Sequence, residues 1–265
     1  MVRVRHKKKY IIIKPVIHQE GSMQFNRNYL VHYYEAGADR RLTLPALIQY
    51  FEDIAILHST ERGLDLDYYE KNHCGWMLIK WDVKVHALPC FGETVLVETR
   101  VHAMKSFMAD REFRMRAEDG TILAEARSNW LLVDTVRRRP IRIPEDQLEK
   151  FPATEEAKAF VAIEDVPVID VPDGAVPRDV LSSYSDMDTN GHVNNVRYIE
   201  WAIDSLPETF LRGKVPAAAR VQYRRELAPS SAALVYTETG EGRSRHRVYS
   251  EDTDYCTLEI TWGPA

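Results

Sequence analysis

Apolar and polar residues follow two different periods in the first half of the chain. Over residues 44–57, apolar side chains return every three or four positions, which predicts one amphipathic helix. Thr43 is expected to cap that helix, with Pro45 in its first turn. Four later stretches are rich in β-branched and aromatic residues and partly alternate in polarity: 77–85, 94–102, 107–117 and 122–133. One helix followed by antiparallel strands predicts an α+β unit.

Short segments of the second half match segments of the first half in the same order. Residues 198–200 match residues 50–52, residues 224–229 match residues 84–89, and Trp262 matches Trp130. The separation between matched segments shrinks along the chain, so the second copy has shorter connections. The pattern predicts a duplicated unit.

The segment between the two copies has little periodicity. Residues 141–177 mix acids, alanines and prolines, and we expect a helical turn or two over residues 147–160, followed by an extended crossover. The predicted domains are therefore an N-terminal unit of residues 1–140 and a C-terminal unit of residues 178–265, joined by this linker.

The composition is that of an ordinary globular protein, with 45% apolar and 28% charged residues among 265. A formal net charge of −5 gives no general attraction to nucleic acid. The three cysteines are far apart, which argues against a disulfide framework or a metal site and favours a reducing compartment. We expect no metal and no cofactor, and no apolar run approaches the ~20 residues of a membrane helix.

The N-terminus is basic, and a short apolar run over residues 10–13 follows it. That run is shorter than the ~7–15 residues of a signal-peptide core. We expect an arm that ends in a short strand, and the alternative is a contact for an acidic partner. The lack of a leader favours a cytoplasmic protein.

The chemistry-bearing residues gather where a polar loop enters a helix. Asp188, Asn190 and His192 lie on that loop, and apolar residues at helical spacing follow them. A helix start offers unpaired N–H groups and the positive end of the helix dipole, which stabilise an anion or a developing oxyanion. Glu226, on a later predicted strand, completes the candidate active site.

Each of these residues also has a purely structural interpretation. Asp188 can serve as a helix N-cap, His192 as a satisfied first-turn histidine, and Glu226 as a surface acid of a strand. Asn194 and Asn195 are expected to be structural, either capping the helix or bonding to the other unit.

Taken together, these motifs resemble the acyl-ACP thioesterase family of the plant FatA/FatB and bacterial type. The resemblance rests on the loop and helix of residues 186–201, on Tyr223-Arg224-Arg225-Glu226, and on first-unit segments such as residues 34–47. It extends from about Phe25 to Trp262.

The resemblance implies two tandem hotdog domains, each a long helix wrapped by a curled antiparallel sheet. It also implies hydrolysis of fatty acyl-ACP to a free fatty acid and holo-ACP, with catalytic roles for Asp188, Asn190, His192 and Glu226. Many plant members have a cysteine directly after the glutamate, whereas this chain has Leu227. A cysteine nucleophile at that position is therefore excluded.

Thioester hydrolysis needs an activated water and a stabilised oxyanion. Glu226 is expected to activate the water as a general base, or to attack directly, from a position partly removed from water. Asn190 and His192 would polarise the carbonyl, and Asp188 would fix their geometry. We expect a backbone amide near His192 or Val193 to complete the oxyanion hole.

The first unit is expected to bind the acyl chain, since its equivalent loop, residues 37–42, lacks the histidine and the asparagine. One catalytic centre per chain follows. Met77, Trp81 and Phe107 are the predicted lining of the acyl pocket.

Acyl carrier proteins are acidic, so the sequence predicts a basic docking rim. The candidate contacts are Arg137, Arg138, Arg139 and Arg142. A second basic group contains Arg178, Arg220, Arg224 and Arg225.

Two other functions are compatible with the same residues. One is an acyl-CoA thioesterase that uses the same centre, and the other is a non-catalytic acyl-binding hotdog protein. Monomer and homodimer are both open, because two fused units already mimic a hotdog dimer.

Overall fold

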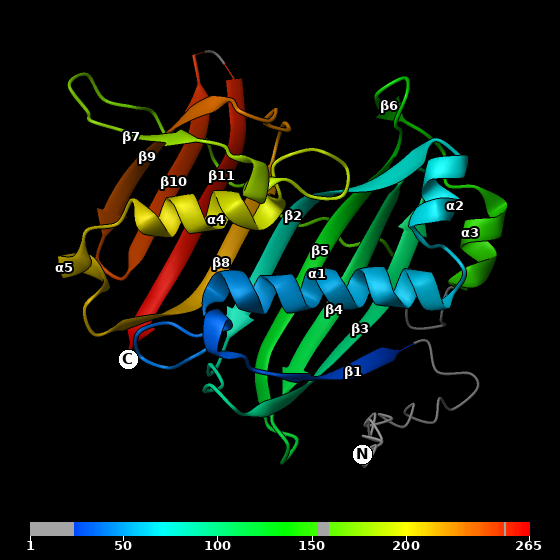
Figure 1. Cartoon of the computed structure of the whole chain (residues 1–265), viewed down its shortest axis with the longest axis horizontal. Coiled ribbons are helices and arrows are strands. Elements are labelled where there is room, and N and C mark those ends of the chain that lie inside the picture. The colour runs from blue at the N-terminus through cyan, green and yellow to red at the C-terminus, as the bar shows by residue number, and fades with distance from the viewer. Residues whose placement is uncertain (1–23, 153–158, 252) are drawn as a thin grey trace, which may run out of the picture.

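The computed structural model of the chain describes residues 24–152, 159–251 and 253–265. Their strands form one antiparallel sheet in the order β1-β3-β4-β5-β2-β8-β11-β10-β9-β7, with β6 paired to β5 (Figure 1). The strands are β1 (Phe25–Leu30), β2 (Cys74–Val85), β3 (Thr94–Lys105), β4 (Met108–Arg116), β5 (Ile122–Asp134), β6 (Arg139–Pro140), β7 (Arg178–Leu181), β8 (Lys214–Tyr223), β9 (Ala232–Gly240), β10 (Arg243–Ser250) and β11 (Thr253–Pro264). The helices are α1 (Leu44–Glu61), α2 (Leu66–Lys71), α3 (Glu145–Lys150), α4 (Asn195–Asp204) and α5 (Glu208–Leu211), with single 3₁₀ turns at η1 (Tyr33–Glu35) and η2 (Tyr184–Asp186).

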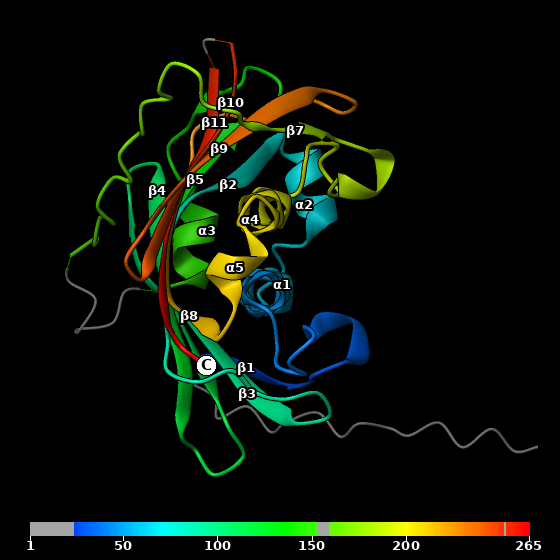
Figure 2. The same ribbon diagram turned by 90° about the vertical axis from the view of Figure 1, so that its left-hand side faces the viewer.

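The strand order is symmetric about the pair β2 and β8. Going outward from β2, the strands are β5, β4, β3 and β1, and going outward from β8 they are β11, β10, β9 and β7. Each half adds one long helix, α1 or α4, and the two helices lie together on one face of the sheet (Figure 2). This is the predicted α+β fold of two tandem hotdog domains.

Helix α1 begins where the sequence predicts and ends later. The hydroxyl of Thr43 accepts a hydrogen bond from the amide of Ala46 at 3.3 Å, so the predicted N-cap is confirmed. The helix continues to Glu61, because a polar residue, His58, occupies the next buried position after the apolar stripe. Gly63, at φ +73°, then turns the chain out of the helix.

The four predicted strands of the first unit are confirmed, although β2 begins earlier and β3 ends later than predicted. In the linker, α3 covers the start of the predicted helix, while residues 153–158 lie outside the described part of the chain. The rest of the linker carries no helix or strand and crosses the sheet: Ile163 bonds to Asn129 of β5, and Val166 bonds to Gln222 of β8. The strand expected over residues 10–13 also falls outside the described residues.

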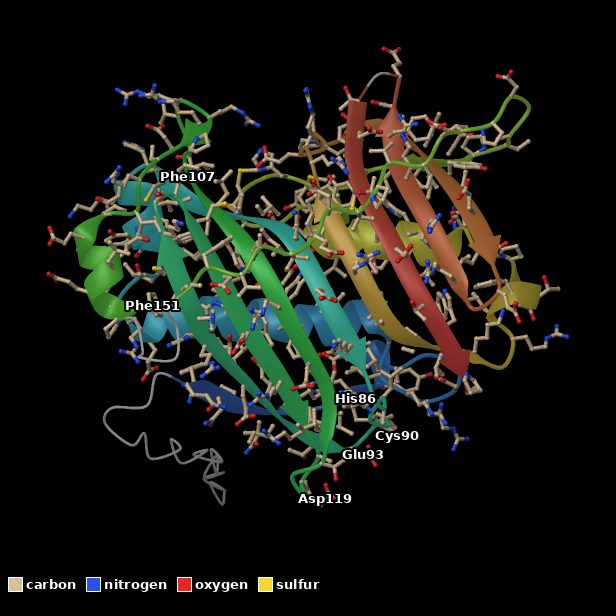
Figure 3. The ribbon with its side chains drawn as sticks, turned by 180° about the vertical axis from the view of Figure 1, so that it is seen from behind. His86, Cys90, Glu93, Phe107, Asp119 and Phe151 are labelled. Carbon is tan, nitrogen blue, oxygen red and sulfur yellow. The ribbon has the colours of Figure 1, made fainter. Side chains whose placement is uncertain are left out.

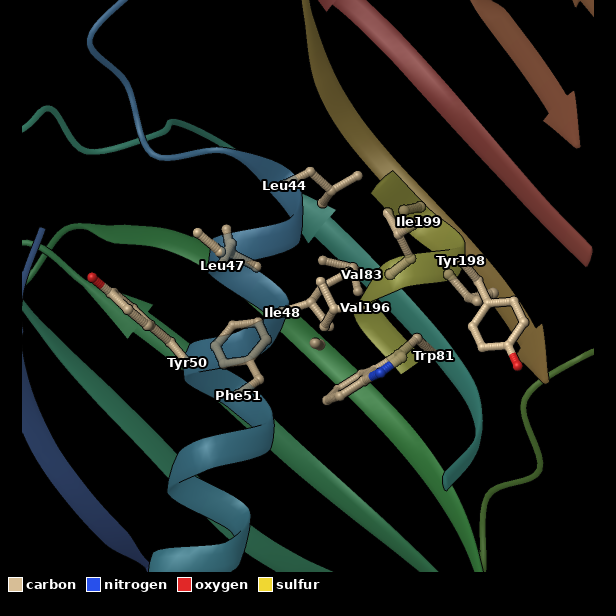
Figure 4. Close-up of a cluster of buried hydrophobic side chains, with 14 of the residues drawn as sticks. Leu44, Leu47, Ile48, Tyr50, Phe51, Trp81, Val83, Val196, Tyr198 and Ile199 are labelled. Carbon is tan, nitrogen blue, oxygen red and sulfur yellow. The ribbon is translucent and has the colours of Figure 1, made fainter. Parts of the chain in front are cut away.

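The two halves share one core. Strand β2 pairs with β8 from Lys80↔Gln222 to Lys84↔Ala218, which makes the two sheets continuous. Above this junction α1 packs beside α4, with Ile48 of α1 close to Val196 of α4 (Figure 4). Burial of these apolar faces from both units stabilises the helices at the positions where the candidate site is built.

One acid lies in this junction. The Oε1 atom of Glu52, on α1, is buried without a hydrogen-bond partner among the described residues. Burial raises the pKa of the Glu52 carboxyl to about 8; the Trp81 indole opposes this shift, and the Asp188 carboxylate of the second unit adds to it. Glu52 is therefore mostly protonated near neutral pH.

Glu52→Gln tests this assignment through the pH dependence of stability. Because the pKa is about 8 in the folded chain and 4.5 in the reference state, the glutamate's contribution is fully present below pH 4.5 and is lost as the pH rises through 8. Glutamine does not titrate, so the Tm of the variant should gain on the parent by at least ~3 °C between pH 6 and pH 9. Thermal unfolding of both proteins over that range measures the difference, and a difference independent of pH contradicts the assignment.

Candidate active site

The loop before α4 is closed by its own backbone. Met187 and Val193 form an antiparallel bridge, and the amide of Asp188 bonds to the carbonyl of His192 at 2.8 Å. Gly191 lies at φ +77°, a left-handed conformation that glycine adopts without strain. The loop therefore holds its polar side chains in a defined arrangement ahead of the helix.

The Asp188 carboxylate stabilises this loop from within. It accepts hydrogen bonds from the amide of Asn190 at 2.8 Å and from that of His192 at 3.2 Å, and the Asn190 side chain lies 3.4 Å from it. The helix cap is instead Asn194, whose side chain accepts from the amide of Val196 at 2.9 Å. Asp188 thus orients its neighbours and does not cap α4.

Glu226 reaches the loop from a different segment of the second unit. Strand β8 ends at Tyr223, so Glu226 lies in irregular chain beyond it; its predicted placement on a strand is wrong. The buried Leu227 anchors this segment, because its amide donates to the Tyr198 hydroxyl at 3.0 Å and its carbonyl accepts from the amide of Val193 at 3.4 Å.

The result is a close contact between His192 and Glu226. His192 Nε2 lies 3.3 Å from Glu226 Oε2, and both side chains are partly buried. Asn190 stands two residues before His192 on the same loop, with its side chain exposed. The structure therefore brings the Glu226 carboxylate to the His192 imidazole, although more than thirty residues separate them in the sequence. The Asn190 amide lies on the same loop as His192.

The expected backbone oxyanion donors have other partners. The amide of His192 donates to Asp188 and the amide of Val193 donates to Leu227, so neither of these two is available, and a backbone donor near them stays a prediction. The side chain of Asn190 is exposed and its amide donates to Asp188 at 3.4 Å, and the NH₂ group carries a second hydrogen for another acceptor. An oxyanion at this site would accept from Asn190 and His192 side chains.

A second unexpected feature is an arginine from the first unit. Arg138, in the turn between β5 and β6, places its Nη2 atom 2.6 Å from Glu226 Oε2. The sequence marks Arg138 only as a docking residue. Its contact with Glu226 follows from the sheet order β5-β2-β8, which a single sequence does not display.

The other predicted docking arginines differ in their surroundings. Arg137 lies 3.8 Å from Asp134, while Arg139 and Arg142 are exposed near the same turn. In the second group most side chains have partners: Arg178 with Asp204, Arg220 with Glu259, and Arg224 with the Val166 carbonyl, whereas Arg225 is exposed. The turn between β5 and β6 is therefore the basic surface beside Glu226.

The three predicted acyl-pocket residues lie at different depths. Trp81 is 0% exposed and packs against Phe51 and Phe113 between the sheet and α1. Met77 is half-buried on β2, and Phe107 is 44% exposed in the turn before β4. Met77 and Met108, the residue after Phe107, pair with the same residue of β5, so both predicted residues lie at one end of the first unit.

A groove of about 1080 Å³ lies elsewhere, between the ends of the two units. His86, Cys90, Glu93 and Asp119 line it at the end of the sheet opposite to Phe107 (Figure 3). By the internal repeat, His86 occupies the position of Glu226. The groove includes none of the candidate catalytic residues.

Cys256 is 0% exposed, and burial raises the pKa of its thiol well above the ordinary value. Cys256 is therefore a poor nucleophile. Within residues 24–152, 159–251 and 253–265, no three His, Cys, Asp or Glu side chains are grouped to hold a metal ion. No helix in the same ranges has the length and apolarity to cross a bilayer.

Comparisons with known proteins identify the family. Residues 22–151 match the family model of the acyl-ACP thioesterase N-terminal domain, and residues 177–264 match that of the C-terminal domain. A chloroplastic palmitoyl-acyl carrier protein thioesterase of Gossypium hirsutum is 29% identical over 246 residues, covering 87% of this chain and 58% of its own length. A chloroplastic acyl-[acyl-carrier-protein] hydrolase of Cuphea viscosissima is also 29% identical, covering 89% and 61%.

Two solved structures share the fold. An acyl-ACP thioesterase from Bacteroides thetaiotaomicron superposes with a TM-score of 0.79 at 21% identity, covering 91% of this chain and 98% of that one. The 12:0-ACP thioesterase from Umbellularia californica gives 0.78 at 23% identity, covering 94% and 100%. The chain spans about three fifths of the length of the plant relatives, and the two family models together cover most of it. This chain belongs to the acyl-ACP thioesterase family.

Proposed function

We propose that this protein hydrolyses the thioester of fatty acyl-ACP to a free fatty acid and holo-ACP, and so terminates fatty acid synthesis. The observation that carries the proposal is the 3.3 Å contact between His192 and Glu226 beside Asn190. These side chains supply a base, a polarising imidazole and an amide donor at one place. The family relationship supports the choice of an acyl-ACP substrate.

In the proposed mechanism, Glu226 removes a proton from a water molecule, which attacks the thioester carbonyl. Asn190 and His192 donate to the carbonyl oxygen as negative charge develops on it. The tetrahedral intermediate collapses by breaking the C–S bond. The thiolate of the carrier's prosthetic arm leaves and takes up a proton, and the fatty acid is released.

The acyl chain is proposed to enter the first unit. The sheet and α1 enclose the apolar interior there, and the loop of residues 37–42 supplies no competing catalytic group. Met77, Trp81 and Phe107 remain the proposed lining, with Trp81 deepest. Burial of the chain against these apolar side chains would supply most of its binding free energy.

The exposed arginines of the β5–β6 turn are proposed to dock the acidic carrier. Arg137, Arg139 and Arg142 lie on the same side of the molecule as Arg138, whose guanidinium reaches Glu226. A basic rim next to the catalytic residues would orient the carrier with its arm toward them.

Glu226→Gln removes the base while keeping size and polarity. We expect kcat on palmitoyl-ACP to fall by roughly 10³-fold or more, with an unchanged Tm, because general-base catalysis contributes ~10²–10⁴-fold. Glu208→Gln, on the exposed helix α5, is the matched control and should keep full activity. Retained turnover in Glu226→Gln would show that Glu226 is not the base, whereas acyl binding without turnover in the parent protein would favour a non-catalytic acyl-binding protein.

Asn190→Ala removes the exposed amide donor. We expect kcat to fall by roughly 10²–10³-fold with a small change in KM, since an oxyanion donor acts mainly in the transition state. Steady-state kinetics with purified palmitoyl-ACP measures both constants. A loss confined to KM would assign Asn190 to ground-state binding.

The double variant Arg139→Ala/Arg142→Ala tests the docking surface. We expect KM for palmitoyl-ACP to rise several-fold at low salt and the salt dependence of kcat/KM to weaken, because exposed charges are screened at ~0.15 M ionic strength. Palmitoyl-CoA is the comparison substrate. If kcat/KM of the wild type is higher for palmitoyl-CoA than for palmitoyl-ACP, the substrate is an acyl-CoA and not an acyl-ACP.

A further inference from the structure

Arg138 is the one group of the first unit whose side chain bonds to a proposed catalytic residue among the described contacts. Its Nη2 atom lies 2.6 Å from Glu226 Oε2, the same oxygen that lies 3.3 Å from His192 Nε2. The arginine and the histidine therefore share one carboxylate oxygen.

The turn that carries Arg138 is held by backbone hydrogen bonds, whereas the Arg138 side chain is largely exposed. The Asp134 carboxylate accepts from the amides of Val136 at 3.0 Å and Arg137 at 2.7 Å, and the Asp134 carbonyl accepts from the amide of Arg138 at 2.8 Å. The Arg138 side chain is nevertheless 69% exposed, against 25% for Glu226. An ion pair with so exposed a partner is worth little free energy and exchanges readily.

The contact opposes the proposed role of Glu226. A general base must contact the water that it deprotonates, and Oε2 of Glu226 is already bonded to the Arg138 guanidinium at 2.6 Å. The docked guanidinium would therefore compete with the attacking water for that oxygen. Removal of Arg138 from this oxygen should therefore raise the reactivity of the site.

Arg138 also stands beside the arginines proposed to meet the carrier. A guanidinium binds phosphate in a bidentate, charge-assisted manner and prefers it to a partly solvated carboxylate. The carrier side of the substrate brings such anions, as the phosphodiester of the prosthetic arm or as acidic side chains of the carrier.

We propose that Arg138 is a substrate-gated positioning residue, which rests on Glu226 in the free protein and is drawn away by an anion on the carrier side of the thioester. This inference rests on the proposed thioesterase function and adds to it a selection for anionic carriers. A thioester with a neutral thiol portion leaves the arginine in place and is hydrolysed slowly, although its acyl chain is the same.

The test compares wild type with Arg138→Gln on three palmitoyl thioesters: palmitoyl-pantetheine, which is neutral, palmitoyl-4′-phosphopantetheine and palmitoyl-ACP. On the neutral thioester Arg138→Gln should raise kcat by up to about fivefold, the range an exposed ion pair can hold back. On palmitoyl-ACP the same variant should leave kcat unchanged and raise KM several-fold. Wild-type kcat on the phosphorylated arm distinguishes the two sources of the anion, since it matches palmitoyl-ACP if the phosphodiester acts and palmitoyl-pantetheine if the carrier's acids act.

Arg212→Gln is the matched control, because Arg212 is also an exposed arginine and pairs with Glu208 away from the site. Tm values of all proteins separate gating from a loss of stability. The proposal is overturned if Arg138→Gln slows both the neutral and the carrier substrate, which would make Arg138 a support for Glu226, or if the two kcat values change equally or not at all. Failure of the thioesterase function itself has a different signature: wild type would then hydrolyse none of the three substrates above the uncatalysed rate.

Discussion

The pairing of β2 with β8 is the constraint on which the rest of the structure depends. Five residue pairs, from Lys80↔Gln222 to Lys84↔Ala218, join two sheets that would otherwise each end in an open edge. In the sheet order β5-β2-β8, the turn after β5 and the segment after β8 lie near each other, because only β2 stands between the two strands. Arg138 and Glu226 meet as a consequence, although 88 residues separate them.

The two units differ in the polar residues that they carry, although their strand order is symmetric. The second unit has the polar loop, its internal Asp188 bonds and the anchored segment around Leu227. The first unit has a loop of similar position without the amide and imidazole, and His86 where the second has Glu226. It contributes instead the longer helix, the buried Glu52 beneath the loop, and the proposed acyl pocket.

Local pattern was sufficient for much of the fold. The stripe on α1, the Thr43 cap and the four strands of the first unit depend on neighbours in sequence, so periodicity predicts them. Helix α1 is longer than predicted because His58 continues its buried face although it is polar, and burial of a polar residue depends on tertiary packing. The continuous sheet across the two units could not be predicted from periodicity, since strand neighbours are set by long-range pairing.

Part of the candidate site could likewise be predicted from the sequence, and part could not. Asp188, Asn190 and His192 lie on one loop, so their proximity can be predicted from spacing alone. Glu226 is expected as a carboxylate on a later strand, and its backbone differs from that expectation because the Tyr198 hydroxyl and Val193 amide bond to Leu227 beyond the end of β8. The Val193–Leu227 and Arg138–Glu226 hydrogen bonds join distant parts of the chain, and the His192–Asp188 bond depends on how the loop closes, so spacing in the sequence predicts none of the three.

The central claim is that His192 and Glu226 act as one catalytic unit. A double-mutant cycle on kcat for palmitoyl-ACP hydrolysis, with His192→Ala, Glu226→Gln and the combination, tests it most directly. If the two side chains act together, the combined variant will be about as slow as the slower single variant. If the two losses multiply, the residues act independently, and the contact at 3.3 Å between them is not the basis of catalysis.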